Sequence, residues 1–303
     1  MGLIRIGSRG SQLALWQAHH VAALLRGHGH EVEIEVIKTT GDRLQEVTFA
    51  QVGTKGMFTL EIEEALADRR IDLAVHSLKD LPTELPGGFV LGATPVRADA
   101  RDVFVSREYA RFADLPAGAR VGTSSLRRRA QLRAIRPDLE YIEFRGNVDT
   151  RLRKLGEGQA AGILLAAAGL DRLGQTEWIR ERIAPEVVCP SAGQGALGIE
   201  IRGGDTRVAE AVAFLDDPAT RFAVTAERTA LAALGGGCQV PIGVHCRAAS
   251  NGYEILGVVA EPAGERVVQS LAVGNEAEKL GQALAADLLR LGAGELLQGI
   301  GIA

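Results

Sequence analysis

Cysteine is scarce in this sequence, and so are aromatic residues and any excess of positive charge. The three cysteines among 303 residues form no CxxC pair, which argues against a disulfide framework and a zinc site and favours a reducing compartment. Aromatic residues make up only 4% of the chain and its net charge is −4, a composition that argues against nucleic acid as a partner. We therefore expect neither a bound metal nor a nucleic-acid partner.

Long apolar runs are absent as well. No stretch approaches the roughly 18 consecutive apolar residues of a membrane span. The first residues, MGLIRIGSRGSQLALWQ, lead into a predicted strand without a basic and then apolar leader. These features predict a cytoplasmic protein with no membrane partner. The length of 303 residues and the hydrophobic share of 46% predict two or three globular domains with cores of their own.

Strand and helix patterns alternate along the first two thirds of the chain. Strands are predicted at residues 3–7 and 31–40 with an amphipathic helix between them, and the alternation restarts near residue 100. From about residue 218 the order changes to one helix, three strands and a final helix. The sequence thus predicts an α/β fold class, with two α/β domains of similar size and a compact α+β domain. The strand expected at residues 196–201 has no evident partner.

Small or hydroxyl residues stand at three junctions between a strand and the following helix. These junctions read IGSRGSQLA, VGTSSLRRR and FRGNVDTRL, and each has arginine beside it. Open α/β sheets bind ligands at the carboxyl ends of their strands, where helix N-termini and arginine side chains both favour anions. The alternative is that Ser11, Thr123 and Ser124 only cap helices and that the arginines face water. Three such junctions favour an anionic ligand between two domains, although the consecutive arginines 127–129 cannot all face it.

Three loops carry further polar residues that could serve a ligand. In AVHSLKDLPTELP, Asp80 follows a strand end, where it either caps N–H groups in a turn or takes part in chemistry. Lys55, flanked by glycines in VGTKGMFTLE, belongs to a surface loop. Gln194 in CPSAGQGALG lies at a predicted crossing between domains, where it either contacts a ligand or braces a hinge.

The cysteine in AALGGGCQVPIGV lies in a glycine-rich loop. Gly235 is the expected C-cap of the preceding helix, so Cys238 falls outside that helix, and loop thiols are retained for reactivity more often than for packing. Cys189 and Cys246 are expected to be structural. A cysteine hydrolase would need a histidine base, and neither histidine outside the first helix and its exit stands in a recognisable dyad pattern. Cys238 is therefore predicted to attach a group rather than to transfer an acyl group.

Eight segments of the sequence, taken in order, resemble the porphobilinogen deaminase family. They are GSRGSQLALWQ, TKGMFTLEIEEAL, DLAVHSLKDLPTELP, VGTSSLRRRAQL, FRGNVDTRLRKL, AAAGLDRLG, GQGALGIEIR and ERTALAALGGGCQVPIG. Together they extend from about residue 3 to the final helix, and their shared order and spacing are more specific than any one of them. One departure is Ser191 in CPSAGQG, where the family more often has alanine.

The resemblance implies an enzyme, a transferase also known as hydroxymethylbilane synthase. In this family a cysteine, here Cys238, holds a dipyrromethane cofactor through a thioether bond. Four porphobilinogen molecules are deaminated and coupled head to tail onto that cofactor, and water then releases hydroxymethylbilane for tetrapyrrole and haem biosynthesis. The implied partners are porphobilinogen and the growing polypyrrole chain, and we expect a monomer.

The resemblance also implies a fold. The family fold resembles type II periplasmic binding proteins, with two α/β domains around a cleft and a small C-terminal α+β domain. We expect the first α/β domain at residues 1–95 and 196–215, the second at residues 96–195, and the domain that carries the cofactor cysteine at residues 218–303.

Site residues follow from the family motifs position by position. Asp80 matches the catalytic aspartate, which would contact pyrrole N–H groups and stabilise positive charge as ammonia leaves. Arginines at the matching positions would pair with the acetate and propionate groups of the pyrroles, and those at helix starts are expected to lie outside the core. They are Arg9, Arg127, Arg128, Arg145, Arg151 and Arg172. The other residues expected to bind cofactor or substrate are Ser11, Lys55, Phe58, Ser77, Lys79, Thr123, Ser125, Gly146, Asn147 and Gln194. Lys55 and Phe58 belong to a loop expected to cover the cleft, whereas Arg129 has no counterpart and is expected to face water.

Two other functions are consistent with parts of this pattern. A non-catalytic anion-binding protein of the same two-lobed architecture would explain the arginines. It would leave Cys238 and Asp80 unexplained, and such proteins ordinarily carry an export signal. A cysteine hydrolase would need a histidine within reach of Cys238.

Overall fold

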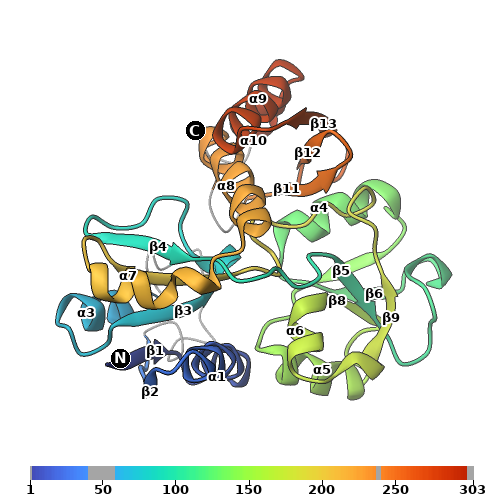
Figure 1. The fold of residues 1–303 in the computed structure, drawn as a ribbon. Coiled ribbons are helices and arrows are strands. Elements are labelled where there is room, and N and C mark those ends of the chain that lie inside the picture. The colour runs from blue at the N-terminus through green and yellow to red at the C-terminus, as the bar shows by residue number, and fades with distance from the viewer. Residues whose placement is uncertain (1, 40–58, 237–239, 299–303) are drawn as a thin grey trace. The chain divides into compact units, whose positions relative to one another are not determined.

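The three-dimensional structure is a computed structural model of the chain, shown in Figure 1. It describes residues 2–39, 59–236 and 240–298. Lys55, Phe58 and Cys238 lie outside these described residues, so what the sequence predicts for them stays a prediction. No helix within the described ranges has both the length and the apolar character that a membrane crossing needs.

The chain forms two compact units, each built from two separate stretches. The first unit combines Met1–Arg97 with Ala196–Arg221, and the second combines Ala98–Gly195 with Phe222–Ala303. The second unit contains two sheets, one of five strands and one of three.

A five-stranded mixed sheet forms the centre of the first unit. Its elements and the helices around it are β1 (Leu3–Ser8), α1 (Gln12–Gly27), β2 (Glu31–Val36), α3 (Leu60–Ala67), β3 (Leu73–Ser77), β4 (Phe89–Ala93), β10 (Leu197–Arg202) and α7 (Thr206–Val212). The strand order is β2-β1-β3-β10-β4, in which β1 is parallel to β2 and β3 while β10 is antiparallel to β3 and β4. Helices α1 and α7 share one apolar cluster with the sheet, and α3 packs in a second cluster through Ile62 and Leu66.

The larger sheet of the second unit repeats this arrangement. Its elements are β5 (Asp102–Val105), β6 (Arg120–Gly122), α4 (Leu126–Ile135), β7 (Glu140–Ile142), α5 (Val148–Gly156), β8 (Gly162–Ala166), α6 (Ala167–Arg172) and β9 (Ile179–Arg182). The order is β7-β6-β8-β5-β9, with β6 parallel to β7 and β8, and β5 antiparallel to β8 and β9. Successive residues of β5 alternate between the two faces. Phe104 therefore packs with α4, whereas Val103 and Val105 pack with α5 and α6.

A three-stranded antiparallel sheet and three helices complete the second unit (Figure 1). They are α8 (Pro218–Ala233), β11 (Ile242–Ala249), β12 (Gly252–Ala260), β13 (Val267–Gly274), α9 (Ala277–Arg290) and α10 (Ala293–Gln298). The three helices bury one face of the sheet, where Ala226, Leu284 and Leu296 share a core with Ile255. On the other face Leu256 and Val258 pack against Cys189, which joins this sheet to the α/β part of the unit.

The predicted fold class is confirmed, because the described residues form two α/β sheets and one small α+β sheet towards the C-terminal end. Gly235 has a left-handed φ of 67° just past the end of α8, as a C-capping glycine should. The strand at residues 196–201 pairs within the first sheet as β10. No predicted element corresponds to α6, α7, α10 or β9. Each of these is short, with at most seven residues.

Candidate active site

One predicted junction and one predicted loop meet at one edge of the first sheet. β1 and β3 run parallel, with Ile6 opposite Leu73, so their carboxyl ends lie on the same side of the sheet. Arg9 and Ser11 follow β1, and Lys79 follows β3. The first unit thereby gathers predicted residues from two separate motifs at one place.

Side-chain hydrogen bonds fix both junctions. Ser11 is the N-cap of α1, and its hydroxyl accepts a hydrogen bond from the N–H of Ala14 at 3.3 Å. Gln17 of α1 donates through Nε2 to the Ser77 hydroxyl at 2.7 Å. Since Ser77 is the last residue of β3, this bond ties the end of that strand to the helix that follows β1.

Asp80 lies in a short 3-10 turn, Leu78–Asp80, directly after β3. Buried Leu78 anchors the turn, and its N–H donates to the carbonyl of Ala196 at 3.0 Å. The Asp80 side chain is exposed, and within the described residues it makes no hydrogen bond or ion pair. The reading of Asp80 as a residue that caps the turn therefore finds no support in the described contacts.

The second unit gathers three junctions in the same way. β6, β7 and β8 are parallel, so their carboxyl ends share one edge of the sheet. The cap of α4 is Ser125, whose hydroxyl accepts from the N–H of Arg128 at 3.4 Å. The alternative in which Thr123 and Ser124 cap the helix is wrong: Thr123 instead accepts from the N–H of Ser125, and Ser124 from that of Phe144. Three successive hydroxyl residues look alike in the sequence, and only the point at which the helix begins distinguishes them.

The junction between β7 and α5 exposes its arginines. Asn147 caps α5 by accepting from the N–H of Thr150 at 2.9 Å. Gly146 has φ of 121°, and a Cβ there would lie 2.6 Å from Thr150 Cγ2, so only glycine fits. Arg151 donates to the Gly146 carbonyl at 2.8 Å, and Arg145 pairs with Glu143 at 3.2 Å. Both arginines are partly exposed, so their guanidinium groups can reach a ligand.

Arg127 and Arg128 are buried, with exposed fractions of 3% and 5%, so the expectation that helix-start arginines lie outside the core is wrong for them. Both pair with Asp102 on β5, at 2.7 Å from Arg127 and 2.8 Å from Arg128. Arg127 also donates to the Cys189 carbonyl and to the Ser191 hydroxyl, at 2.7 and 3.0 Å. Ser191, the departure from the family pattern, thus serves as a partner for Arg127.

Asp102 is the centre of this buried cluster and is fully inaccessible to solvent. Burial alone would raise the pKa of its carboxyl group, but the charges and hydrogen bonds of Arg127 and Arg128 outweigh that effect and hold the pKa well below its usual value. Gln194 is equally buried and donates to Asp102 at 2.9 Å and to the Ala100 carbonyl at 2.7 Å. Of the two roles considered for Gln194, these contacts favour bracing. Asp102 carries no local signal in the sequence, because it is one acidic residue at the start of an apolar strand.

Arg172 ends α6, after the third parallel strand of this edge. It donates to the Gly195 carbonyl at 2.7 Å. Burial lowers the pKa of Arg172 to about 10, a change that the nearby Asp171 opposes, so the side chain keeps its charge at neutral pH. Arg129 pairs with Glu143 at 3.7 Å and is only partly exposed, rather than free in water as expected.

The remaining two cysteines are free and buried, as expected of structural thiols. Cys189 has an exposed fraction of 0%, and burial raises the pKa of its thiol. No group of three or more metal-ligating side chains suited to a metal ion occurs within the described ranges.

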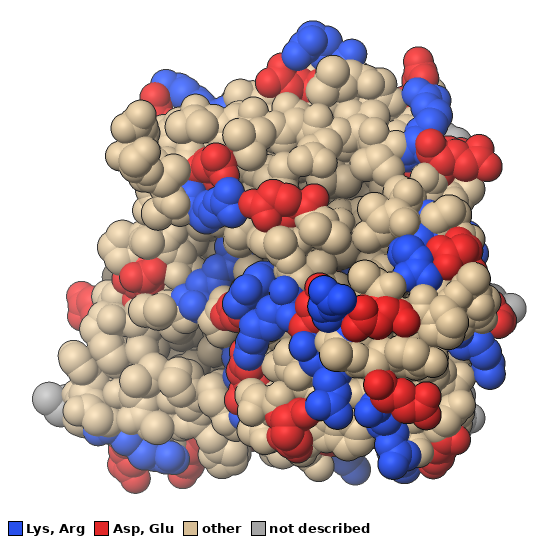
Figure 2. Space-filling model, turned by 90° about the vertical axis from the view of Figure 1, so that its right-hand side faces the viewer, with Lys and Arg blue, Asp and Glu red and all other residues tan. Residues whose placement is uncertain are grey.

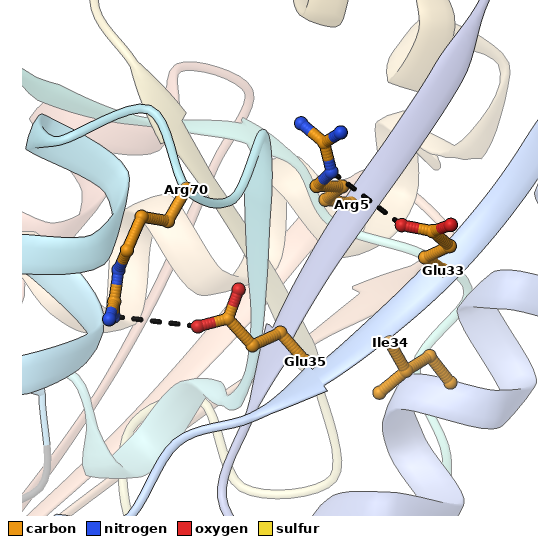
Figure 3. A pocket seen from close by; sticks show the side chains of 5 residues that line it. All are labelled: Arg5, Glu33, Ile34, Glu35 and Arg70. Carbon is orange, nitrogen blue, oxygen red and sulfur yellow. Dashed lines mark ion pairs between the residues drawn. The ribbon is translucent and has the colours of Figure 1, made fainter.

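A surface pocket of about 440 Å³ lies elsewhere on the first unit. Figure 3 shows its lining, in which Arg5 faces Glu33 and Arg70 faces Glu35. These ion pairs measure 3.6 and 3.5 Å and are partly exposed, and none of their residues belongs to the predicted site. On the face of the molecule in Figure 2, acidic side chains likewise stand beside basic ones.

Comparison with known proteins identifies the family through most of the chain. Residues 4–210 match the family model described as the porphobilinogen deaminase dipyromethane cofactor binding domain, and residues 221–290 match the porphobilinogen deaminase C-terminal domain. The chain is 50% identical to the porphobilinogen deaminase of Nitratidesulfovibrio vulgaris strain Miyazaki F, covering 96% of this chain and 95% of that protein. It is 51% identical to the porphobilinogen deaminase of Desulforudis audaxviator, with 96% of each chain covered.

Solved structures with a similar chain trace include binding proteins. One is a periplasmic substrate-binding protein of an ABC transporter from Coxiella burnetii, with a TM-score of 0.44, 16% identity, and 72% of this chain and 94% of that one covered. Another is a nutrient-binding protein from Burkholderia cenocepacia, with a TM-score of 0.43, 13% identity, and coverage of 69% and 90%. The family models and the relatives at about half identity, by contrast, establish that the chain belongs to the porphobilinogen deaminase family of transferases.

Proposed function

We propose that this protein is itself a porphobilinogen deaminase, or hydroxymethylbilane synthase, which couples four porphobilinogen molecules in tetrapyrrole biosynthesis. The observation that carries the proposal is the match of the family's cofactor-binding model to residues 4–210, the stretch in which every predicted anion-binding arginine lies. Within that stretch the position of the family's catalytic aspartate holds an exposed carboxylate, Asp80, on a turn fixed to the sheet.

The described residues fit a dipyrromethane group that carries acetate and propionate side chains. Two sheet edges offer cationic side chains beside capped helix N-termini, which is the donor set that carboxylates require. The glycine at position 146 keeps the backbone free of a Cβ beside Arg145 and Asn147. When bound to Cys238, the cofactor would supply the acceptor to which each new pyrrole unit is joined.

Asp80 would stabilise the positive charge that develops on porphobilinogen as its carbon–nitrogen bond breaks and ammonia departs. A carboxylate acts in this way when it is held in place before the reaction, so that little reorganisation is needed. The anchoring of Leu78 to Ala196 and of Ser77 to Gln17 provides that rigidity. Lys79, on the same turn, would hold a carboxylate of the cofactor or substrate.

Among the arginines, we assign carboxylate binding first to Arg9, Arg145, Arg151 and Arg172. The first three are partly exposed, and Arg172 keeps its charge despite its burial. Arg127 and Arg128 would act mainly by holding the first turn of α4 in place, because their paired carboxylate is Asp102. Thr123, Ser125 and Asn147 would add neutral hydrogen bonds around the same edge.

We also propose that the enzyme works as a cytoplasmic monomer on porphobilinogen and the growing polypyrrole, without nucleic-acid or membrane partners. The two free, buried cysteines support a reducing compartment. A reducing compartment would also keep the thiol of Cys238 available for the cofactor.

Asp80→Asn tests the proposed function. The substitution keeps the size of the side chain and one acceptor oxygen but removes its charge, so we expect kcat to fall about 10²–10³-fold. Thermal unfolding should stay unchanged, because the described Asp80 carboxylate supports no fold contact. Hydroxymethylbilane formation would be measured on purified, cofactor-loaded protein, with Glu84→Gln in the following loop as the control. Near-wild-type kcat in the Asp80→Asn enzyme would overturn this role.

Intact-mass spectrometry tests the attachment at Cys238. We expect the purified protein to exceed its sequence mass by two pyrrole units and to colour with Ehrlich's reagent. The adduct should map to Cys238, since Cys189 and Cys246 are buried. Active enzyme with an unmodified Cys238 would contradict the assignment.

A further inference from the structure

A buried histidine lies at the end of β3, just before the turn that carries Asp80, and the proposed reaction does not use it. His76 has an exposed fraction of 8%, and its Nε2 lies 3.0 Å from Oε2 of Glu200 on β10, which is fully buried. The two residues are 124 positions apart in the sequence. Their pairing therefore depends on the antiparallel contact between β3 and β10.

The strand ladder explains why the two side chains meet. His76 stands opposite Gly198, and Glu200 stands opposite Ala74, so residues 74, 76 and 200 project from one face of the sheet. Ala74 packs on that face with α3. Ser77, the next residue of β3, projects to the other face and meets Gln17 of α1. The last two residues of β3 are thus each held by a side-chain hydrogen bond, one on either face.

Holding β3 and β10 together through the His76–Glu200 contact carries a large desolvation cost. Glu200 Oε1 has no hydrogen-bond partner among the described residues, and neither has Oε1 of Glu63 on α3 nearby. Burial raises the pKa of Glu63, the Glu200 charge raises it further, and Thr59 and His76 partly offset both effects. Apolar residues in place of such a buried pair are often neutral or stabilising. The geometry that the pair imposes is therefore a better explanation for its presence than stability.

We propose that His76 and Glu200 are a positioning pair for the turn that carries Lys79 and Asp80, an inference that rests on the proposed function. The N–H of Leu78 in this turn already donates to the carbonyl of Ala196, the residue just before β10. Glu200 lies on β10 itself, and its carboxylate contacts His76, which is two positions before Leu78. The pair and the backbone bond together fix how β3 leaves the sheet, and hence where the Asp80 carboxylate stands. Small displacements of a catalytic group cost large factors in rate.

Four variants separate positioning from stability. Glu200→Gln removes the charge and His76→Leu removes the donor, and each should lower kcat about 10–100-fold with KM nearly unchanged. The double variant His76→Leu/Glu200→Met removes the buried Glu200 charge together with its partner, so it should regain the thermal stability that His76→Leu loses. Its kcat should nevertheless stay low. His76→Gln keeps an N–H donor at a similar reach and should restore most of the rate.

The matched control is Arg202→Met, which removes a partly buried charged side chain from the opposite end of the same two strands. Arg202 donates to the Leu66 and Ile71 carbonyls at 2.8 and 2.6 Å and pairs with Asp72. Its loss should lower the melting temperature and leave kcat per loaded molecule unchanged. Wild-type kcat in Glu200→Gln or in the folded double variant would overturn the positioning role. An inactive wild-type protein would instead refute the proposed function itself, so the two failures are distinguishable.

Discussion

At the junction between β6 and α4 the arginines point into the protein, whereas at the junction between β7 and α5 they stay near its surface. Arg127 and Arg128 share buried Asp102, while Arg145 and Arg151 are partly exposed beside Gly146. Both junctions belong to parallel strands of the same sheet edge. The same residue type is therefore buried against a carboxylate at one junction and partly exposed at the other.

A buried carboxylate accounts for this difference. Asp102, at the start of β5, provides the negative charge that makes the burial of two guanidinium groups tolerable. The arginines near α5 have Glu143, whose side chain is half exposed, and a backbone carbonyl. Exposed ion pairs are worth little, and an incoming carboxylate can therefore displace them.

Asp102→Asn should have the largest effect on the buried junction. It leaves two buried arginines without a charged partner, so we expect the free energy of unfolding to fall by about 3–5 kcal/mol. Urea unfolding would measure it. The control is Glu157→Gln, which breaks the exposed Arg153–Glu157 pair on α5 and should cost less than about 1 kcal/mol. Equal losses in the two variants would erase the distinction between the buried and exposed junctions.

The pH dependence of stability provides a second measure of the same junction. The folded protein holds the pKa of Asp102 below its unfolded value of 3.8, so its stabilising effect is complete above that pH and is lost as pH falls below it. Wild-type protein should therefore lose stability in acid more steeply than Asp102→Asn. Urea midpoints from about pH 7 down to pH 3 would show the two curves converging. Parallel curves would mean that Asp102 is not the group that titrates.

Arg145→Leu should have the smallest effect on stability and a specific effect on function. Loss of one charge-assisted partner costs about 1.5–3 kcal/mol of binding, so partly extended enzyme–pyrrole complexes should accumulate as discrete extra masses. The urea midpoint should stay close to that of the wild type. Arg153→Leu, on the exposed side of α5, is the matched control and should turn over normally. Normal turnover of Arg145→Leu without extra masses would remove it from the binding set.

Local patterns in the sequence were sufficient for the fold class but not for the partners of its buried polar residues. The alternation of strands and helices predicts both α/β sheets, because each βα step is a short-range signal. The pairing of β10 with β3 joins residues more than a hundred positions apart, and no local pattern encodes it. The same holds for Arg127 with Asp102 and for His76 with Glu200. The position of Asp80 just past a strand end was predictable, since its motif is contiguous.

The late position of β10 in the chain affects the order in which the protein can fold during synthesis. β4 ends at Ala93 and β10 begins at Leu197, a gap of about a hundred residues, or about 5–20 s of translation. During that interval β10 is not yet available to pair with β3 and β4, so each of these strands has an unpaired edge. Unpaired strand edges promote aggregation. All five strands of the next sheet lie between Asp102 and Arg182, inside the gap. The sheet of the first unit, whose strands are synthesised first, is therefore completed only after the β5–β9 sheet of the second unit.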